Sequence, residues 1–190
     1  MKSDSWITDR VLTDSIIQPF SGVSVKSENG RKVCSYGISC AGYDLRLAKD
    51  VYSVCGQETL DPKETSIEKD FIRSQSMIDE KGEYVLLRPG FSLASTVEYI
   101  DMPDDATALL LIKSTYARLG VSIIAPLIEP GWRGYPTVSI VNNNKIPVKL
   151  YLNEGFCQIV FFGCDGVKKN YDQHGGRYQD SVGATVSSVQ

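Results

Sequence analysis

The sequence predicts an all-β protein, a sandwich or barrel of short strands with one short helix at its N-terminus. Two observations predict this class. Short apolar runs rich in Val, Ile, Leu, Tyr and Phe recur from residue 33 onward, and turns rich in Gly, Pro, Asn and Asp separate them. This regular spacing is typical of sandwiches and barrels. The length suits one hydrophobic core, so residues 1–190 are expected to form a single domain.

The N-terminal residues 1–20 are expected to form the short helix, followed by a turn at Pro19. Asp4 or Ser5 is expected to cap this helix, because short polar side chains accept hydrogen bonds from the first backbone amides. The apolar residues of the segment have partly helical spacing: Trp6, Ile7, Val11, Ile16 and Ile17.

The apolar runs predict strands over residues 84–87, 91–98, 108–112, 121–125, 137–141, 148–152 and 157–162. Residues 60–82 are polar and charged, so they are interpreted as a long surface excursion with one helical turn. Residues 171–190 lack bulky apolar side chains and are rich in Gly, Ser and Gln. This composition favours a disordered tail, and the functional alternative is a flexible lid that orders over a ligand.

Composition excludes several classes of protein. The formal net charge of -3 gives the whole chain no electrostatic reason to bind DNA or RNA. No apolar run approaches the roughly 20 residues of a membrane span, so no membrane partner is expected. The polar start MKSDSWITDR has no signal core, and a cytoplasmic location is the default expectation.

Zinc is not expected as a cofactor. Zinc-dependent nucleobase deaminases need a C-x-x-C pair, and the five cysteines here are scattered, with one histidine in the whole chain. An odd, scattered set of cysteines favours reduced thiols that pack as small apolar side chains.

The segment KSTYARLG (113–120) is a candidate phosphate site. It follows an apolar strand and brings together Lys113, Ser114, Thr115 and Arg118. Hydroxyls, backbone amides and a guanidinium can together hold phosphate oxygens. The alternative without a ligand is that these residues form a basic strand end exposed to solvent.

Three further segments carry candidate groups. In IEPGWRG (128–134), Glu129 precedes a tight Pro-Gly turn. In SCAGYDLR (39–46), Asp44 and Arg46 share one strand face. The alternative to a functional role is that they form a purely structural ion pair. The tail offers Tyr171, Arg177, Tyr178 and Gln179 as possible ligand contacts.

Taken together, these segments resemble the dCTP deaminase family, which shares a trimeric fold with dUTPases. The matching stretches are SYGISCAGYDLR (35–46), KSTYARLG (113–120), IEPGWRGYPT (128–137), LNEGFCQIVFF (152–162) and GGRYQ (175–179). The resemblance implies a distorted β-barrel or jelly-roll-like fold of the dUTPase type. It also implies a homotrimer with sites between subunits, a pyrimidine deoxynucleoside triphosphate as ligand, and Mg²⁺ bound through the triphosphate.

The resemblance also implies roles for particular residues. Ser114 and Arg118 would contact the triphosphate or position the reacting water. In dUTPases an acid at the position that resembles Glu129 orients water against the α-phosphate, and Glu129 would serve that catalytic role. The tail would close over the ligand. The nucleotide-binding set implied in this way is Lys113, Ser114, Thr115, Arg118, Gln158, Tyr171, Arg177 and Gln179.

The sequence departs from the family on the side of the base. Family deaminases carry a Glu ten residues after the acid that corresponds to Glu129, and Ser139 stands there. Attack of water on C4 of cytosine needs a group that cycles protons, and a Ser hydroxyl is a poor base near neutral pH. Ile124 and Pro126 stand where polar base-contacting residues are expected, and Pro136 enters the strand that would carry the Glu.

Three functions remain open at this point. The first is a dUTPase-type hydrolase that cleaves dUTP, dCTP or a modified pyrimidine triphosphate to monophosphate and pyrophosphate. This function is favoured because the residues expected to contact the phosphates match the family better than those expected to contact the base. The second is a dCTP deaminase with a rewired general base, and the third is a non-catalytic nucleotide-binding or regulatory homologue. For the two enzymatic functions the catalytic candidates are Glu129, Ser114 and Arg118.

Overall fold

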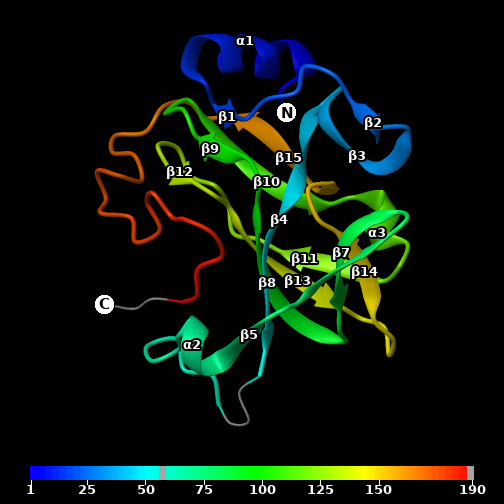
Figure 1. The fold of residues 1–190 in the computed structure, drawn as a ribbon. Helices are drawn as coiled ribbons and strands as arrows, with labels where there is room; N and C mark the ends of the chain where they lie inside the picture. The colour runs from blue at the N-terminus through cyan, green and yellow to red at the C-terminus, as the bar shows by residue number, and fades with distance from the viewer. Residues whose placement is uncertain (56–58, 188–190) are drawn as a thin grey trace.

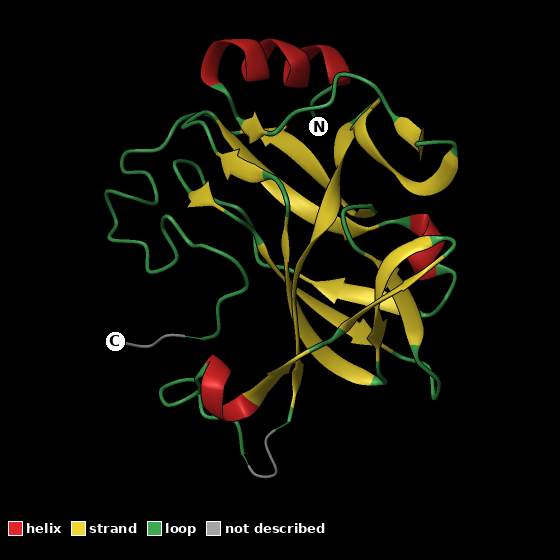
Figure 2. Cartoon of the chain, viewed as in Figure 1, coloured by secondary structure: helices red, strands yellow, loops and turns green. Residues whose placement is uncertain are grey.

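The computed structural model describes residues 1–55 and 59–187 (Figure 1). Strands make up most of the regular structure, and helices contribute one N-terminal element and two single turns (Figure 2). The helices are α1 (Asp4–Asp14), α2 (Ile67–Asp70) and α3 (Ser114–Ala117). The strands are β1 (Ile17–Gln18), β2 (Val25–Glu28), β3 (Arg31–Ser39), β4 (Gly42–Val54), β5 (Phe71–Arg73), β6 (Ser76–Asp79), β7 (Gly82–Leu87), β8 (Gly90–Thr96), β9 (Tyr99–Asp101), β10 (Ala106–Ile112), β11 (Val121–Ile124), β12 (Arg133–Gly134), β13 (Thr137–Asn142), β14 (Val148–Tyr151) and β15 (Gly155–Gly163).

One large antiparallel sheet dominates the fold. Its strands follow the order β10-β15-β4-β8-β13-β11, with β2, β3 and β5 attached at the side, and two three-stranded sheets flank it. The outer strands β10 and β11 do not pair with each other in the described part of the chain, so the sheet does not close into a barrel. The all-β prediction is confirmed, and each predicted strand lies on an observed one.

The core forms where β4 and β15 run side by side. Tyr43, Leu45, Phe156, Ile159 and Phe161 are all fully buried there. On β13 the residues alternate between buried and partly exposed, which puts Val138 and Ile140 in the core and turns the residues between them to the opposite face. This alternation decides which side chains of β13 are available to a ligand.

The N-terminal helix is confirmed, but its predicted cap is wrong. Ser3 is the N-cap residue, and its side chain makes no capping hydrogen bond. Asp4 already lies in the first turn of the helix, where its carboxylate accepts from the Ser5 amide at 2.8 Å. The helix ends at Ser15, which has a φ of 57°. The helix covers one end of the sheet, with Ile7 fully buried.

The excursion at residues 60–82 is more ordered than its composition predicts. Beside the expected helical turn α2, it contains β5, which pairs with the end of β4, and β6, which pairs with β7. These short strands are held mainly by backbone hydrogen bonds at sheet edges, and such pairing leaves little apolar periodicity in the sequence. Among the described residues, no helix is long and apolar enough to cross a membrane.

Candidate functional site

A cavity of about 700 Å³ lies between the C-terminal segment (residues 171–187), residues 60–65 and the strands β8 and β13. Its walls are mostly apolar, with Leu93, Leu110, Trp132 and Pro136 among them. Residues 60–65 and the C-terminal segment meet at its edge, where the Ser187 hydroxyl donates to the Pro62 carbonyl at 3.1 Å. The size and the apolar lining are typical of pockets that bind small molecules.

Ser139 belongs to the lining of this cavity. It lies on the face of β13 that turns away from the core, directly opposite Leu93 on β8 and Ile124 on β11. Its hydroxyl therefore stands in an apolar stretch of the sheet, with Thr137 as the neighbouring hydroxyl on the same face. Pro136 precedes the first paired residue of β13, so its missing N–H costs no ladder hydrogen bond.

Glu129 lines the same cavity from the turn that precedes β12. Among the described lining residues it carries the one carboxylate. The turn holds it in place, because the Trp132 amide donates to the Glu129 carbonyl at 3.1 Å and Trp132 is itself buried. The Glu129 side chain is exposed, so its carboxylate is accessible to a ligand and to water.

The C-terminal segment packs along this cavity through residue 187. The Trp132 indole N–H donates to the Tyr178 carbonyl at 2.9 Å, and the Gln179 amide donates to the Gly131 carbonyl at 2.9 Å. Tyr171 lines the cavity, and its hydroxyl accepts from the Tyr178 amide at 3.0 Å. Residues 188–190 of the expected tail lie outside the described residues, and opening of the segment as a lid stays a prediction.

An ion pair fastens the same segment to β12. Arg133 donates to the two carboxylate oxygens of Asp180 at 2.7 and 3.1 Å, and this contact lowers the pKa of Asp180. Next to it, Gly134 has a φ of 147° and would place a Cβ 2.8 Å from the Ser181 hydroxyl. The segment can approach β12 this closely because Gly134 has no side chain.

The phosphate candidates lie elsewhere, around the start of α3. The Lys113 ammonium donates to the Asp44 carboxylate and, at 3.2 Å, to the Ser35 hydroxyl. Burial raises the pKa of Asp44, although Lys113 opposes the shift. The Gln158 amide, adjacent to Asp44 in the β15–β4 register, donates to the Ser39 hydroxyl at 2.9 Å. These five residues form a polar cluster that is linked to the start of α3 through Lys113.

Ser114, Thr115 and Arg118 are exposed beside this cluster. The predicted pairing of Asp44 with Arg46 is wrong, because Asp44 pairs with Lys113 while Arg46 donates to Glu98 at 2.7 Å. Glu98 is fully buried, and this pairing was not predicted, because nothing in its neighbourhood along the chain marks Glu98 as a partner of Arg46.

Within one chain, the candidate residues at the cavity lie far from the candidate residues around α3. Ile128, next to Glu129, forms a bridge to Ala108 near the start of β10, whereas Lys113 follows the last residue of that strand. At about 3.4 Å per residue, the five steps from Ala108 to Lys113 span roughly 17 Å. The C-terminal segment and α3 accordingly lie on opposite sides of the molecule (Figure 1).

The predicted site residues therefore form two sets. Glu129, Ser139, Tyr171 and Gln179 lie at or beside the cavity, and Lys113, Ser114, Thr115, Arg118 and Gln158 lie around α3. Arg177 is exposed in the C-terminal segment and does not line the cavity. The cavity wall formed by residues 60–65 was not predicted, because long-range packing of a polar loop leaves no local signal in the sequence. The roles of all these residues stay predictions.

Comparison with known proteins identifies the family. A family model described as dCTP deaminase-like matches residues 1–164. A dCTP deaminase of Alcanivorax borkumensis is 38% identical over 191 residues, and the alignment covers 98% of this chain and 97% of that protein. A dCTP deaminase of Laribacter hongkongensis is 40% identical over 190 residues, with the same coverage.

A solved structure shows the same fold. The 2′-deoxycytidine 5′-triphosphate deaminase from Agrobacterium tumefaciens superposes with a TM-score of 0.55 at 19% sequence identity. The match covers 84% of this chain and 47% of that chain, so this protein spans about half the length of that structure.

The prediction of dUTPase-type hydrolysis is wrong, because these relatives are named dCTP deaminases. That expectation relied on Glu129 and on the residues expected to contact the phosphates, which match the family better than those expected to contact the base. A carboxylate in this position suits either reaction, however, because it can direct water at a ring carbon as well as at phosphorus. The family match over most of the sequence shows that this chain belongs to the dCTP deaminase-like family.

Proposed function

We propose that this protein is a dCTP deaminase, which converts dCTP and water to dUTP and ammonia. Its support is the set of relatives with that name, which align along 98% of the chain. The observation that carries the proposal is the cavity in which the Glu129 carboxylate and the Ser139 hydroxyl are both part of the lining. An apolar pocket with a few polar groups suits a pyrimidine ring.

Glu129 is proposed as the group that moves protons. Water adds to C4 of cytosine while the carboxylate takes one of its protons and passes it to ring nitrogen N3. The second proton of the water leaves with the exocyclic amino group as ammonia, and C4 keeps the oxygen. A carboxylate can alternate between base and acid in this way, whereas the Ser139 hydroxyl can donate a hydrogen bond but is a poor base.

The triphosphate is proposed to bind at the polar cluster around α3. Ser114, Thr115 and Arg118 offer hydroxyl and guanidinium donors at the surface, and Lys113 is held beside them by Asp44. Because the cavity and this cluster lie at opposite ends of β10 in one chain, we propose a homotrimer in which they meet between subunits. Mg²⁺ would enter on the triphosphate and neutralise part of its charge.

The test is incubation of the purified protein with each pyrimidine deoxynucleoside triphosphate and Mg²⁺, followed by separation of the products. The proposal predicts release of ammonia and formation of dUTP from dCTP. Release of pyrophosphate without ammonia, or recovery of unchanged dCTP, contradicts it.

A second candidate is nucleotide binding without turnover. The observation that favours it is the apolar setting of Ser139, between Leu93 and Ile124, where family deaminases carry the catalytic carboxylate. Calorimetric binding of dCTP with no ammonia released over the same period would identify this function.

A further inference from the structure

A second cavity, of about 880 Å³, lies between the β2–β3 hairpin, the β6–β7 turn and α3. Its charged lining residues are the cations Lys26, Arg31, Lys32 and Lys81 and the carboxylates Glu80 and Glu154. Cations thus outnumber carboxylates here, in a chain whose formal net charge is -3. These four cations lie outside both sets of candidate site residues.

The hairpin is shaped so that consecutive residues face this cavity. Between the pairs Val25–Tyr36 and Ser27–Lys32, β2 has one residue and β3 has three, so β3 bulges. A bulge redirects side chains that regular alternation would send to the other face. Lys32 and the three residues after it all line the cavity as a result.

Arg31 is held in a fixed place at the cavity wall. Its guanidinium lies 3.5 Å from the carboxylate of Glu154, which is buried and also accepts from the Cys34 amide at 2.7 Å. The guanidinium packs against Gly82, where an added Cβ would come within 2.8 Å of it. The negative charge of Glu154 is therefore already paired inside the protein.

The three lysines lack such a partner among the residues that the structure describes. In residues 1–55 and 59–187, Lys26, Lys32 and Lys81 make no salt bridge, although all three line one cavity. Like charges placed together repel one another, and a bound anion with several oxygens would relieve this repulsion.

Thr115 joins this cavity to the predicted phosphate residues. It lines the cavity and follows Ser114 in α3. Tyr116, the next residue, is buried, and its hydroxyl accepts from the Tyr151 amide at 3.2 Å and lies 3.6 Å from the Cys34 sulfur. Because both contacts are cavity-wall residues, α3 is anchored to the wall with Thr115 at its edge.

We propose that this cavity is an oligophosphate-binding site, with Lys26, Arg31 and Lys32 as the cationic ligands and Thr115 as a hydroxyl donor. A chain of phosphates matches the spread of cations over the hairpin better than a single small anion does. The phosphates belong either to the nucleotide of the proposed reaction or to a free oligophosphate. The site itself does not depend on the proposed deamination.

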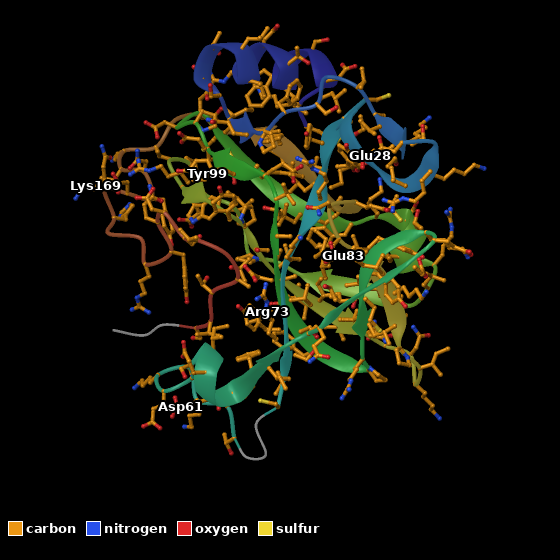
Figure 3. All side chains as sticks on the ribbon, viewed as in Figure 1. Glu28, Asp61, Arg73, Glu83, Tyr99 and Lys169 are labelled. Carbon is orange, nitrogen blue, oxygen red and sulfur yellow. The ribbon has the colours of Figure 1, made fainter. Side chains whose placement is uncertain are left out.

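The test is a calorimetric titration of the full chain with sodium tripolyphosphate at low salt, without nucleotide. The variant Lys26→Ala/Lys32→Ala is compared with the control Lys168→Ala/Lys169→Ala, which removes the same charge. Neither control residue lines the cavity, and Lys169 lies on the opposite side of the molecule from Glu28 in the hairpin (Figure 3). Both cavity lysines are exposed, and circular dichroism would verify that each variant folds.

The wild type and the control are expected to bind tripolyphosphate within about twofold of each other, and the hairpin variant at least about tenfold more weakly. Equal binding by variant and control, or no binding by the wild type, overturns the proposal. A parallel titration with dCTP distinguishes the sources: a matching loss assigns the site to the nucleotide, and an unchanged affinity assigns it to a free oligophosphate. Since ammonia release is not measured, an inactive enzyme leaves this test intact.

Discussion

Replacement of Arg46 by Met is expected to destabilise the protein strongly, because it leaves the fully buried Glu98 without its counter-charge. The Arg46 Nε donates to one carboxylate oxygen at 2.7 Å, and the Arg46 backbone amide donates to the other at 2.8 Å. Met keeps the backbone contact and the side-chain length but removes the guanidinium. Loss of one partner of a buried pair typically costs about 3–5 kcal/mol. At about 2–4 °C per kcal/mol for a domain of this size, the melting temperature should fall by roughly 6–20 °C.

Urea unfolding at neutral pH measures this loss, and its pH dependence tests the cause. Burial raises the pKa of Glu98 above its ordinary value of 4.5, while Arg46 opposes the shift. The folded wild type therefore already binds this proton more tightly than the unfolded state, and removal of Arg46 raises the pKa of Glu98 in the folded state further. The stability deficit of the variant relative to the wild type should be absent below pH 4.5, grow between the folded-state pKa of the wild type and that of the variant, and stay constant above both.

The double variant Arg46→Met/Glu98→Gln removes both charges and is the matched control. It should recover most of the lost stability, because burial of a neutral amide costs less free energy than burial of an unpaired carboxylate. A loss below about 1 kcal/mol in the single variant would mean that the pair behaves like an exposed one, and the reasoning would be refuted.

Three further predictions concern the site. Arg118→Ala should weaken dCTP binding by about 1.5–3 kcal/mol in a calorimetric titration, and an unchanged affinity would remove Arg118 from the phosphate site. Arg133 holds the pKa of Asp180 below 3.8, so the ion pair stabilises the C-terminal segment above that pH and is lost as the pH falls through the lowered pKa. The protection of amides 178–185 against hydrogen exchange, taken relative to the intrinsic exchange rate at each pH, should fall when the pH drops through this lowered pKa. Asp180→Asn should lower the same protection at neutral pH, and equal protection in variant and wild type would argue against the ion pair. Gly134→Ala should displace the same segment, since its Cβ would lie 2.8 Å from the Ser181 hydroxyl, and unchanged exchange there would refute this.

Seven strands could be predicted from the sequence because their side chains carry the signal: β7, β8, β10, β11, β13, β14 and β15. β13 alternates apolar core residues with Thr and Ser, and β15 is apolar on both faces and buried almost throughout. The strands β5 and β6 were not predicted, because they are held at sheet edges by backbone hydrogen bonds that any residue can make.

The candidate site residues could be singled out from the sequence, but their arrangement could not. Asp44 pairs with Lys113 and Arg46 with Glu98, and each partner lies more than 50 positions away along the chain. Residues Asp44 and Arg46 share one face of β4, so the sequence favoured an ion pair between them. Register across the sheet decides the true partners, and local spacing carries no information about it.

Ammonia release from dCTP tests most directly whether Glu129 moves protons in a dCTP deaminase. Glu129→Gln should lower the rate by about 10²–10⁴-fold, because general acid–base catalysis contributes that much. Glu68→Gln removes a carboxylate that is exposed on α2 and does not line the cavity, so it should keep the wild-type rate. A Glu129→Gln protein that releases ammonia as fast as the wild type, or a wild type that releases none, would contradict the claim.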